Sequence, residues 1–243
     1  MIFMVLQTMQ VVSDHGLVDE ADLLPQCGSP AFPLDGIGRQ CFYEAFVRTH
    51  VLDELSMDSS GFLPSPADAG TCMPTGVPVA ENASAIVQGR VNDGNAYILG
   101  GISGHAGLFS TAVDIEKVVR ALMWPEDHGG FLNDTTVAYF TTEHNHSQSS
   151  RALGWDTNDP DAPGTVMLCG NMSANTFTHT GYTGTQICAD KGRGLYSILL
   201  TNRVYPNDTD FRIEDLRKAF NSAVVVAANA TSNSTAREHR HHE

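Results

Sequence analysis

The chain has 243 residues, and 42% of them are hydrophobic, so it is long and apolar enough to bury a substantial core as one large domain. Its 14 basic residues against 28 acidic ones give a formal net charge of −14 with histidine neutral. That charge repels nucleic acid and anionic lipid, so we expect no polyanionic partner.

The first twelve residues are apolar at helical spacing, and Gly16 follows where a left-handed stop is needed. We predict a core helix over residues 2–12, because the segment has no basic flank or small-residue cleavage site and is too short to cross a bilayer. Nothing else in the sequence reaches membrane-spanning length, so we expect a soluble protein, with the compartment left open.

The next segments alternate between loop and helix. Residues 17–38 are rich in Gly and Pro and predict a loop. Residues Arg39 to Leu55 carry apolar residues at helical spacing and predict a helix bent near Thr49. Residues 56–98 contain four prolines and several glycines and predict a long irregular connection.

The clearest local signal is a helix that begins after Thr111. The threonine oxygen can accept the amide hydrogen of Asp114, whose carboxylate favours the positive end of the helix. Apolar residues follow at i, i+3, i+4 and i+7, and Trp124-Pro125 marks the expected end.

The C-terminal third changes to a strand pattern. Three segments rich in β-branched and aromatic residues, 176–180, 185–189 and 195–202, predict three consecutive antiparallel strands. We predict a helix over 212–228 that packs an apolar stripe of side chains on that sheet. A polar, mobile tail is expected after it. The stripe is formed by Leu216, Phe220, Val224 and Ala227. The histidines near the end of the tail are expected to be solvated, and no metal site is predicted.

Five cysteines stand far apart, with no C-x-x-C pair and an odd total, so the sequence implies neither a zinc site nor a disulfide framework. We expect buried or incidental thiols. Seven N-x-Ser/Thr triplets would permit glycosylation if the chain entered a secretory pathway. They begin at Asn82, Asn133, Asn145, Asn171, Asn207, Asn229 and Asn233.

Two glycine-rich strings carry the functional information: GGISGHAGLFSTAVD from Gly100 to Asp114, and FTHTGYTGTQICAD from Phe177 to Asp190. Together with MIFMVLQTM and FVRTHVLDELSMDSSGFLPSP, which precede them in the chain in the family's order, they resemble the C-terminal half of serine β-lactamases and penicillin-binding-protein-like hydrolases. The likeness runs from the first residues to about Pro206 and is greatest to stand-alone hydrolases related to class C β-lactamases.

The resemblance implies an α+β fold of the β-lactamase/transpeptidase type, in which an antiparallel sheet flanked by helices lies beside a mostly helical region. It also implies that the N-terminal part of that fold, with its strands and nucleophile helix, is missing here. We expect a partial domain over 1–228, mainly helix and loop over 1–125 and sheet strands with the C-terminal helix over 150–228, followed by a polar tail over 229–243.

The resemblance places His179-Thr180-Gly181 at the family's Lys-Thr-Gly or His-Thr-Gly strand, whose edge lies along the substrate acyl group. Thr180 would offer a hydroxyl to a substrate carboxylate, and Gly181 would let the substrate approach without a Cβ. The backbone N–H of Tyr182 would supply one oxyanion-hole donor. No cofactor and no metal are implied.

Ser103, His105 and Gly107 in GISGHAGLF resemble a family signature that shapes the rim of the cleft. A Ser/His catalytic pair is rejected here, because a nucleophile and base two residues apart in a glycine turn lack a third, orienting group. Nearby, Asp93 and Asn95 are expected to fix the following loop through side-chain to backbone bonds.

This sequence also departs from the family pattern. No serine is followed three residues later by lysine, and the only Tyr-x-Asn, beginning at Tyr205, follows the final strand. Asn92 stands where relatives tend to have histidine, and Gly76 where many have glutamate. Without the family's Ser and Tyr, both nucleophile and base are missing.

Two hypotheses follow. The first is an incomplete serine hydrolase that would act on an amide or ester of a small peptide-like or β-lactam-like molecule and is inactive as this chain, with a complementary polypeptide or upstream exon supplying the serine. The second is a non-catalytic binding or scaffold protein, a pseudoenzyme that keeps the rim of the cleft for recognition.

Overall fold

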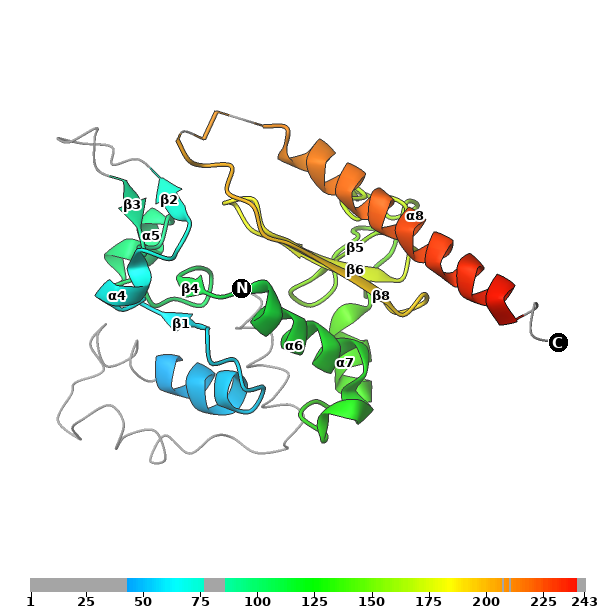
Figure 1. The fold of residues 1–243 in the computed structure, drawn as a ribbon, viewed down its shortest axis with the longest axis horizontal. Helices are drawn as coiled ribbons and strands as arrows, with labels where there is room; N and C mark the ends of the chain where they lie inside the picture. The colour runs from blue at the N-terminus through cyan, green and yellow to red at the C-terminus, as the bar shows by residue number, and fades with distance from the viewer. Residues whose placement is uncertain (1–42, 77–85, 207, 210, 240–243) are drawn as a thin grey trace.

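The computed structural model describes residues 43–76, 86–206, 208–209 and 211–239 (Figure 1). The helix predicted over 2–12 and the loop over 17–38 lie outside the described residues. The described helices are η1 (Arg48–Asp53), α4 (Pro66–Ala69), α5 (Gly94–Ile98), α6 (Ala112–Met123), η2 (Pro125–His128), α7 (Asp134–Thr141) and α8 (Ile213–His239). The strands are β1 (Gly61–Phe62), β2 (Pro74–Gly76), β3 (Val87–Gln88), β4 (Leu108–Phe109), β5 (Asp156–Thr157), β6 (Thr176–Thr180), β7 (Gln186–Asp190) and β8 (Leu195–Leu199).

The main sheet has the strand order β5-β6-β7-β8, and every neighbouring pair is antiparallel. The three predicted strands are therefore confirmed, although the last ends at Leu199 rather than at residue 202. Strand β5 was not predicted, because two residues are too few to show a period. Figure 1 shows α8 along one face of this sheet, with α6 and α7 toward the other.

Strand β7 is buried along its whole length because both faces of the sheet are covered. Ile187 and Ala189 join the core cluster that contains α6, whereas Cys188 faces a second cluster that includes Val225 of α8. This alternation follows from the two-residue period of a strand.

Helix α6 begins and ends as predicted. The Thr111 hydroxyl accepts the amide hydrogen of Asp114 at 3.2 Å, and Trp124 is the C-terminal cap residue. The Asp114 carboxylate also accepts from Ser59 N and Ser60 Oγ, each at 2.8 Å. These bonds tie the turn after η1 to the start of α6.

Of the helix predicted over 39–55, residues 43–53 are helical, first as α-helix and then as π-helix. The change to the π-helix η1, in which Val51 and Leu52 are buried, begins at Arg48, next to the residue where the sequence predicted an irregularity. The connection predicted over 56–98 to be irregular contains the short elements β1, α4, β2, β3 and α5. Each has at most five residues, which is too short for the periodicity to reveal.

Helix α8 differs most from its prediction. The side chains buried against the sheet are Arg217, Asn221 and Val225, each at most 6% exposed, whereas Leu216 of the predicted stripe is 48% exposed. Asn221 and the Nη2 of Arg217 are hydrogen-bonded, which is the condition under which polar groups are tolerated in a core, whereas Arg217 Nε has no partner among the described residues. The helix also continues to His239, so the predicted mobile tail beginning at residue 229 is wrong over this stretch.

Cys169 and Cys188 form a disulfide, with a Cα–Cα distance of 5.9 Å and with both residues fully buried. The expectation that no cysteines pair was therefore wrong. The pairing joins the segment before β6 to the middle of β7, which are separated by 19 positions in the sequence, so no short spacing motif reveals it. Cys72 is free.

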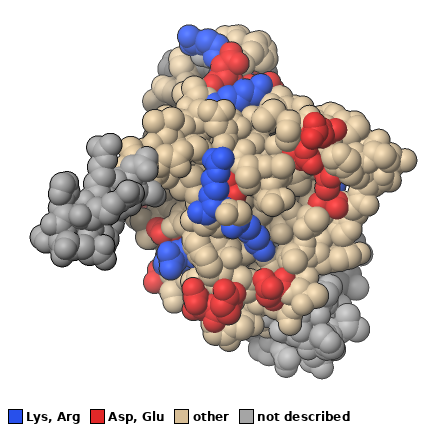
Figure 2. Space-filling view, turned by 90° about the vertical axis from the view of Figure 1, so that its right-hand side faces the viewer, with Lys and Arg blue, Asp and Glu red and all other residues tan. Residues whose placement is uncertain are grey.

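No helix in the described part of the chain is long and apolar enough to span a bilayer. On the face shown in Figure 2, acidic and basic side chains are interspersed among uncharged residues. That face therefore offers no continuous basic surface to a polyanion.

Candidate functional site

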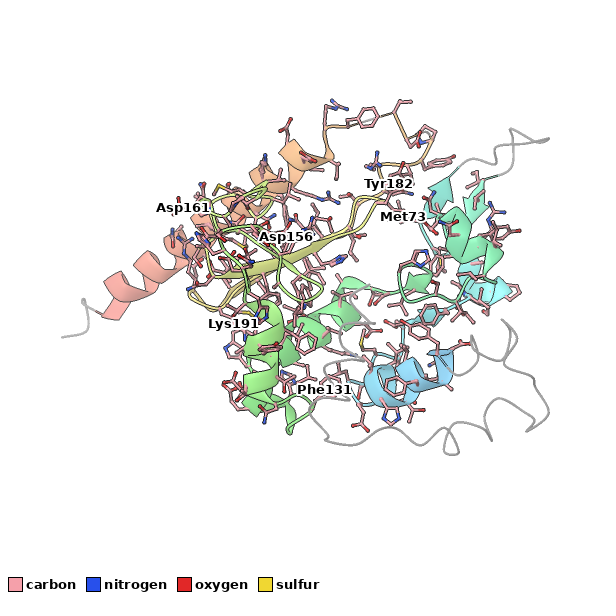
Figure 3. All side chains as sticks on the ribbon, turned by 180° about the vertical axis from the view of Figure 1, so that it is seen from behind. Met73, Phe131, Asp156, Asp161, Tyr182 and Lys191 are labelled. Carbon is pink, nitrogen blue, oxygen red and sulfur yellow. A yellow bond between two sulfur atoms is a disulfide. The ribbon has the colours of Figure 1, made fainter. Side chains whose placement is uncertain are left out.

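His179 and Thr180 end strand β6, and a turn over 181–185 leads back into β7. Figure 3 shows Tyr182 at the end of the sheet that is directed toward the β2–β3 side of the molecule, while Asp161 and Lys191 lie at the other end. His179, Thr180, Gly181 and Tyr182 thus lie at one exposed tip of the sheet, whereas Ser103, His105 and Gly107 lie on the loop before β4. The tip has a partly buried base and an exposed Tyr182 side chain.

His179 is held against the core by aromatic packing. Its ring packs edge-to-face on the ring of Trp155, with 6.2 Å between the ring centroids. Trp155, which is 1% exposed, packs edge-to-face on Phe177 in turn, with 4.9 Å between the centroids. Trp155 is therefore a core residue that packs against β6. Burial lowers the pKa of His179 to about 4, so the imidazole is neutral at physiological pH and can hydrogen-bond but carries no charge.

The turn after Thr180 is closed by backbone hydrogen bonds in both directions. Gly181 N donates to Thr185 O at 2.8 Å, and Gly184 N donates to Gly181 O at 3.0 Å. A Cβ on Gly181 would lie 2.2 Å from Thr185 Oγ1, so the Thr185 side chain would have to shift to admit any other residue here. This crowding favours glycine in addition to the substrate clearance that the resemblance implied.

Arg217 fixes the orientation of the peptide that links Gly181 to Tyr182. Its Nη2 lies 2.9 Å from both Gly181 O and Thr185 O, and its side chain is buried under the turn. Burial lowers the pKa of Arg217, but a guanidinium stays charged at any physiological pH. The buried cation therefore sits directly behind the turn.

The Gly181 carbonyl and the Tyr182 N–H belong to one planar trans peptide, so they point in opposite directions. Because the carbonyl points to Arg217, the N–H points away from Arg217, and no acceptor among the described residues takes it. This is the arrangement required of an oxyanion donor, which must be fixed but unpaired before the substrate arrives.

A second arginine holds the next peptide. Arg203 Nε donates to Tyr182 O at 2.8 Å, and its guanidinium lies 4.3 Å from the centroid of the Tyr182 ring. The Tyr182 hydroxyl in turn donates to Asp208 at 3.2 Å. Sequence reasoning missed both arginines, because nothing in the spacing of residues 203 and 217 relates them to residue 181.

The loop with Ser103 and His105 is organised by a residue that the sequence did not connect to it. Ser103 Oγ lies 2.7 Å from His105 Nδ1, and His105 Nε2 lies 2.9 Å from Asp93 Oδ1. We rejected a Ser/His pair because a third, orienting group was lacking; that reason was wrong, since Asp93 is such a group. The His105 and Asp93 side chains are nevertheless 45% and 40% exposed, so water competes for each bond.

Asp93 Oδ1 also accepts from Ala96 N at 2.8 Å; the predicted side-chain to backbone bond is therefore present, but it caps the helix α5, which was not predicted. The hydrogen bonds from Ala96 and His105 hold the pKa of Asp93 below its ordinary value. Gly107 has φ +114°, and a Cβ there would lie 2.2 Å from Gly101 O, which confirms a structural use of this glycine turn. Asn92 donates to the carbonyl oxygen of Thr75 and so joins the α5 segment to β2.

Two other features of the described residues lie apart from this tip. An open groove of about 480 Å³ runs beside α8 and includes none of residues 179–182; it is lined by Pro160, Thr165, Val166, Met167, Gly170, Asn171, Lys218 and Ser222. A surface cluster of Glu143, His146 and Asp159 brings three possible metal-ligand atoms within 4.8 Å of one another. There the Glu143 carboxylate is hydrogen-bonded to His146 Nδ1 and raises the pKa of His146.

Comparison with known proteins identifies the family. The family model described as Beta-lactamase matches residues 39–221. Putative D-alanyl-D-alanine carboxypeptidases from Salmonella enteritidis PT4 and Escherichia coli K12 are 36% and 35% identical over 118 residues, which is 47% of this chain but 27% of each relative. The match thus spans about a quarter of the length of these curated relatives.

Among solved structures, a β-lactamase from Mycobacterium bovis superposes with a TM-score of 0.53 at 18% identity and covers 93% of this chain and 84% of its own. This likeness concerns the fold alone. The family model covers three quarters of the chain, and the described helices and antiparallel sheet agree with the fold. The chain therefore belongs to the β-lactamase family, the superfamily of serine β-lactamases and penicillin-binding proteins.

Proposed function

We propose that this chain forms the substrate-side wall of a serine acyl hydrolase that acts on peptide-like amides or esters. In this proposal the family's nucleophile is carried by polypeptide outside these 243 residues. The chain contributes the His179–Tyr182 edge, against which the acyl group lies. The observation that carries the proposal is the Tyr182 N–H, which is unpaired although its peptide is fixed.

The two arginines give the edge its electrostatic role. The neutral His179 cannot attract a substrate carboxylate as a lysine would, so the positive potential comes from Arg217 behind the turn and Arg203 beside it. The Thr180 hydroxyl then donates the hydrogen bond to the substrate carboxylate. We infer an anionic, peptide-like substrate, in keeping with the carboxypeptidase names of the relatives.

During acyl transfer the attacked carbonyl oxygen becomes an oxyanion. The Tyr182 N–H donates to it without reorganisation, because Gly181 O is already held by Arg217 Nη2 and Gly184 N. The second donor and the attacking hydroxyl must both come from the nucleophile's segment. The chain by itself therefore lacks the groups that form an acyl-enzyme.

The test uses a fluorescent penicillin and a fluorophosphonate on the native protein isolated from its own cells, with the labelled residue located by mass spectrometry. We expect label on a serine outside residues 1–243 and none on the purified 243-residue chain. Label on a serine within the chain, Ser103 included, would contradict the proposal. Reversible binding of the penicillin without any covalent label would favour the non-catalytic binding protein.

A paired substitution tests the edge itself. Thr180→Ala in the native protein removes a hydrogen bond to a charged group, which is about 1.5–3 kcal/mol, so the acylation rate constant should fall roughly 10- to 100-fold. Thr183→Ala, three residues on in the same turn, is the matched control and should leave the rate within about twofold.

A further inference from the structure

The N-x-Ser/Thr triplets are far more frequent than composition explains. The sequence has 13 asparagines, and 37 of its 243 residues are Ser or Thr, so chance would place 13 × 37/243, or about two, asparagines in such triplets. Seven are in triplets. An excess of this size favours a selected modification site over an accident of a Ser/Thr-rich sequence.

Exposure separates the asparagines further. All four triplet asparagines whose side chains are described are exposed: Asn133, Asn145, Asn171 and Asn229. Among the described residues, two asparagines are fully buried, Asn158 and Asn221; both are outside triplets and use their amides for internal hydrogen bonds. The triplets therefore occur where a bulky polar group fits.

Asn145 and Asn171 present their amides best. Asn171 lies in a turn before β6; its backbone N and O are bonded to Ser222 and Arg193, and its side-chain amide has no partner among the described residues. At Asn145, Oδ1 accepts from Ser147 Oγ at 2.9 Å. The bond to Oδ1 leaves Nδ2 free, and Nδ2 is the atom that is modified.

The buried Cys169–Cys188 disulfide supplies an independent indication of the compartment. Disulfides persist in oxidising environments such as the secretory pathway and are rare in the cytosol. This one is fully buried and lies next to the Asn171 turn. The same compartment contains the machinery that modifies exposed N-x-Ser/Thr asparagines.

We propose that this protein is N-glycosylated at Asn145 and Asn171 while it folds in an oxidising secretory compartment. The Asn Nδ2 attacks C1 of an oligosaccharide carried on a dolichyl pyrophosphate. One N–C bond forms, the C–O bond to the pyrophosphate breaks, and the amide loses one proton. The lipid pyrophosphate is the leaving group, and no oxidant or reductant takes part.

A single tryptic peptide tests both observations, because residues 152–191 contain no internal Lys or Arg. It carries both cysteines of the disulfide, Asn171, and two asparagines outside triplets, Asn158 and Asn175. The native protein is alkylated at lysis, digested, and treated with peptide N-glycosidase in water enriched in heavy oxygen, which converts each glycosylated asparagine into labelled aspartate. The neighbouring peptide 121–151 reports on Asn145.

We expect labelled aspartate at positions 145 and 171 in most of the protein, unlabelled asparagine at 158 and 175, and an intact disulfide in the unreduced peptide. A Ser147→Ala variant keeps Asn145 but destroys its triplet and should lose one glycan, seen as one step on a gel. Unmodified asparagine at both 145 and 171, or alkylated Cys169 and Cys188, would overturn the proposal.

Discussion

The bond between α8 and the turn at the sheet tip can be tested by replacing Arg217 with methionine, which keeps the length of the side chain but removes its charge. The wild-type guanidinium donates from Nη2 to Gly181 O and Thr185 O, each at 2.9 Å. In the variant both carbonyls keep one other donor, Gly184 N and Gly181 N respectively, so neither becomes an orphan.

The expected cost follows from these bonds. A hydrogen bond from a charged donor contributes about 1.5–3 kcal/mol, so losing two at the low end gives about 3 kcal/mol. Removing the charge also removes its desolvation penalty, which offsets part of this loss, since Arg217 is 6% exposed and no carboxylate is bonded to it among the described residues. We expect the free energy of unfolding to fall by about 2 kcal/mol.

The assay is urea unfolding followed by tryptophan fluorescence, because Trp155 is buried near the turn and reports its loss. Lys218→Met, the adjacent and partly exposed position on α8, is the matched control and should change stability by no more than about 0.5 kcal/mol. Hydrogen exchange at the Gly184 amide should accelerate in Arg217→Met. Equal stability of Arg217→Met and wild type would refute the view that this arginine holds the turn.

Three further outcomes follow from the described contacts. Burial lowers the pKa of His179 to about 4, so between pH 6.5 and 4 the unfolded chain binds a proton that the folded chain does not. The free energy of unfolding should therefore fall as the pH is lowered through that window, and it should fall less in His179→Gln. Urea titration at each pH measures both. Cys188→Ala opens a loop with a sequence separation of 19 and should cost about 3 kcal/mol by the same assay, whereas an unchanged midpoint would show that the pairing is not formed. At Asp114 burial raises the pKa, but the hydrogen bonds to the carboxylate, led by the one from Lys117, outweigh burial and leave the pKa below its ordinary value. The stability that these bonds give is present above the ordinary pKa and is lost as the pH falls through the pKa of the folded state. Asp114→Asn should therefore lower the free energy of unfolding by about 1–3 kcal/mol at pH 7 and by progressively less in acid, as measured by thermal unfolding.

Local chemistry determined several features from the sequence alone. The Thr111 cap and the apolar period fixed helix α6, because both act within a few residues and need no tertiary partner. The three strands before α8 followed from β-branched residues and a glycine turn. The two glycine-rich strings indicated the family by resemblance, and in the first of them the close approach of Gly107 to Gly101 O requires glycine.

The tertiary structure alone decided which distant groups meet. Hydrophobic spacing placed Leu216 on the buried face of α8, but the hydrogen bonds of Arg217 and Asn221 to the sheet outweigh that small gain and turn the helix. The pairing of Cys169 with Cys188 and the bond from His105 to Asp93 likewise join residues 12 to 19 positions apart. No local period records such contacts, because their energy arises only when separate segments are packed together.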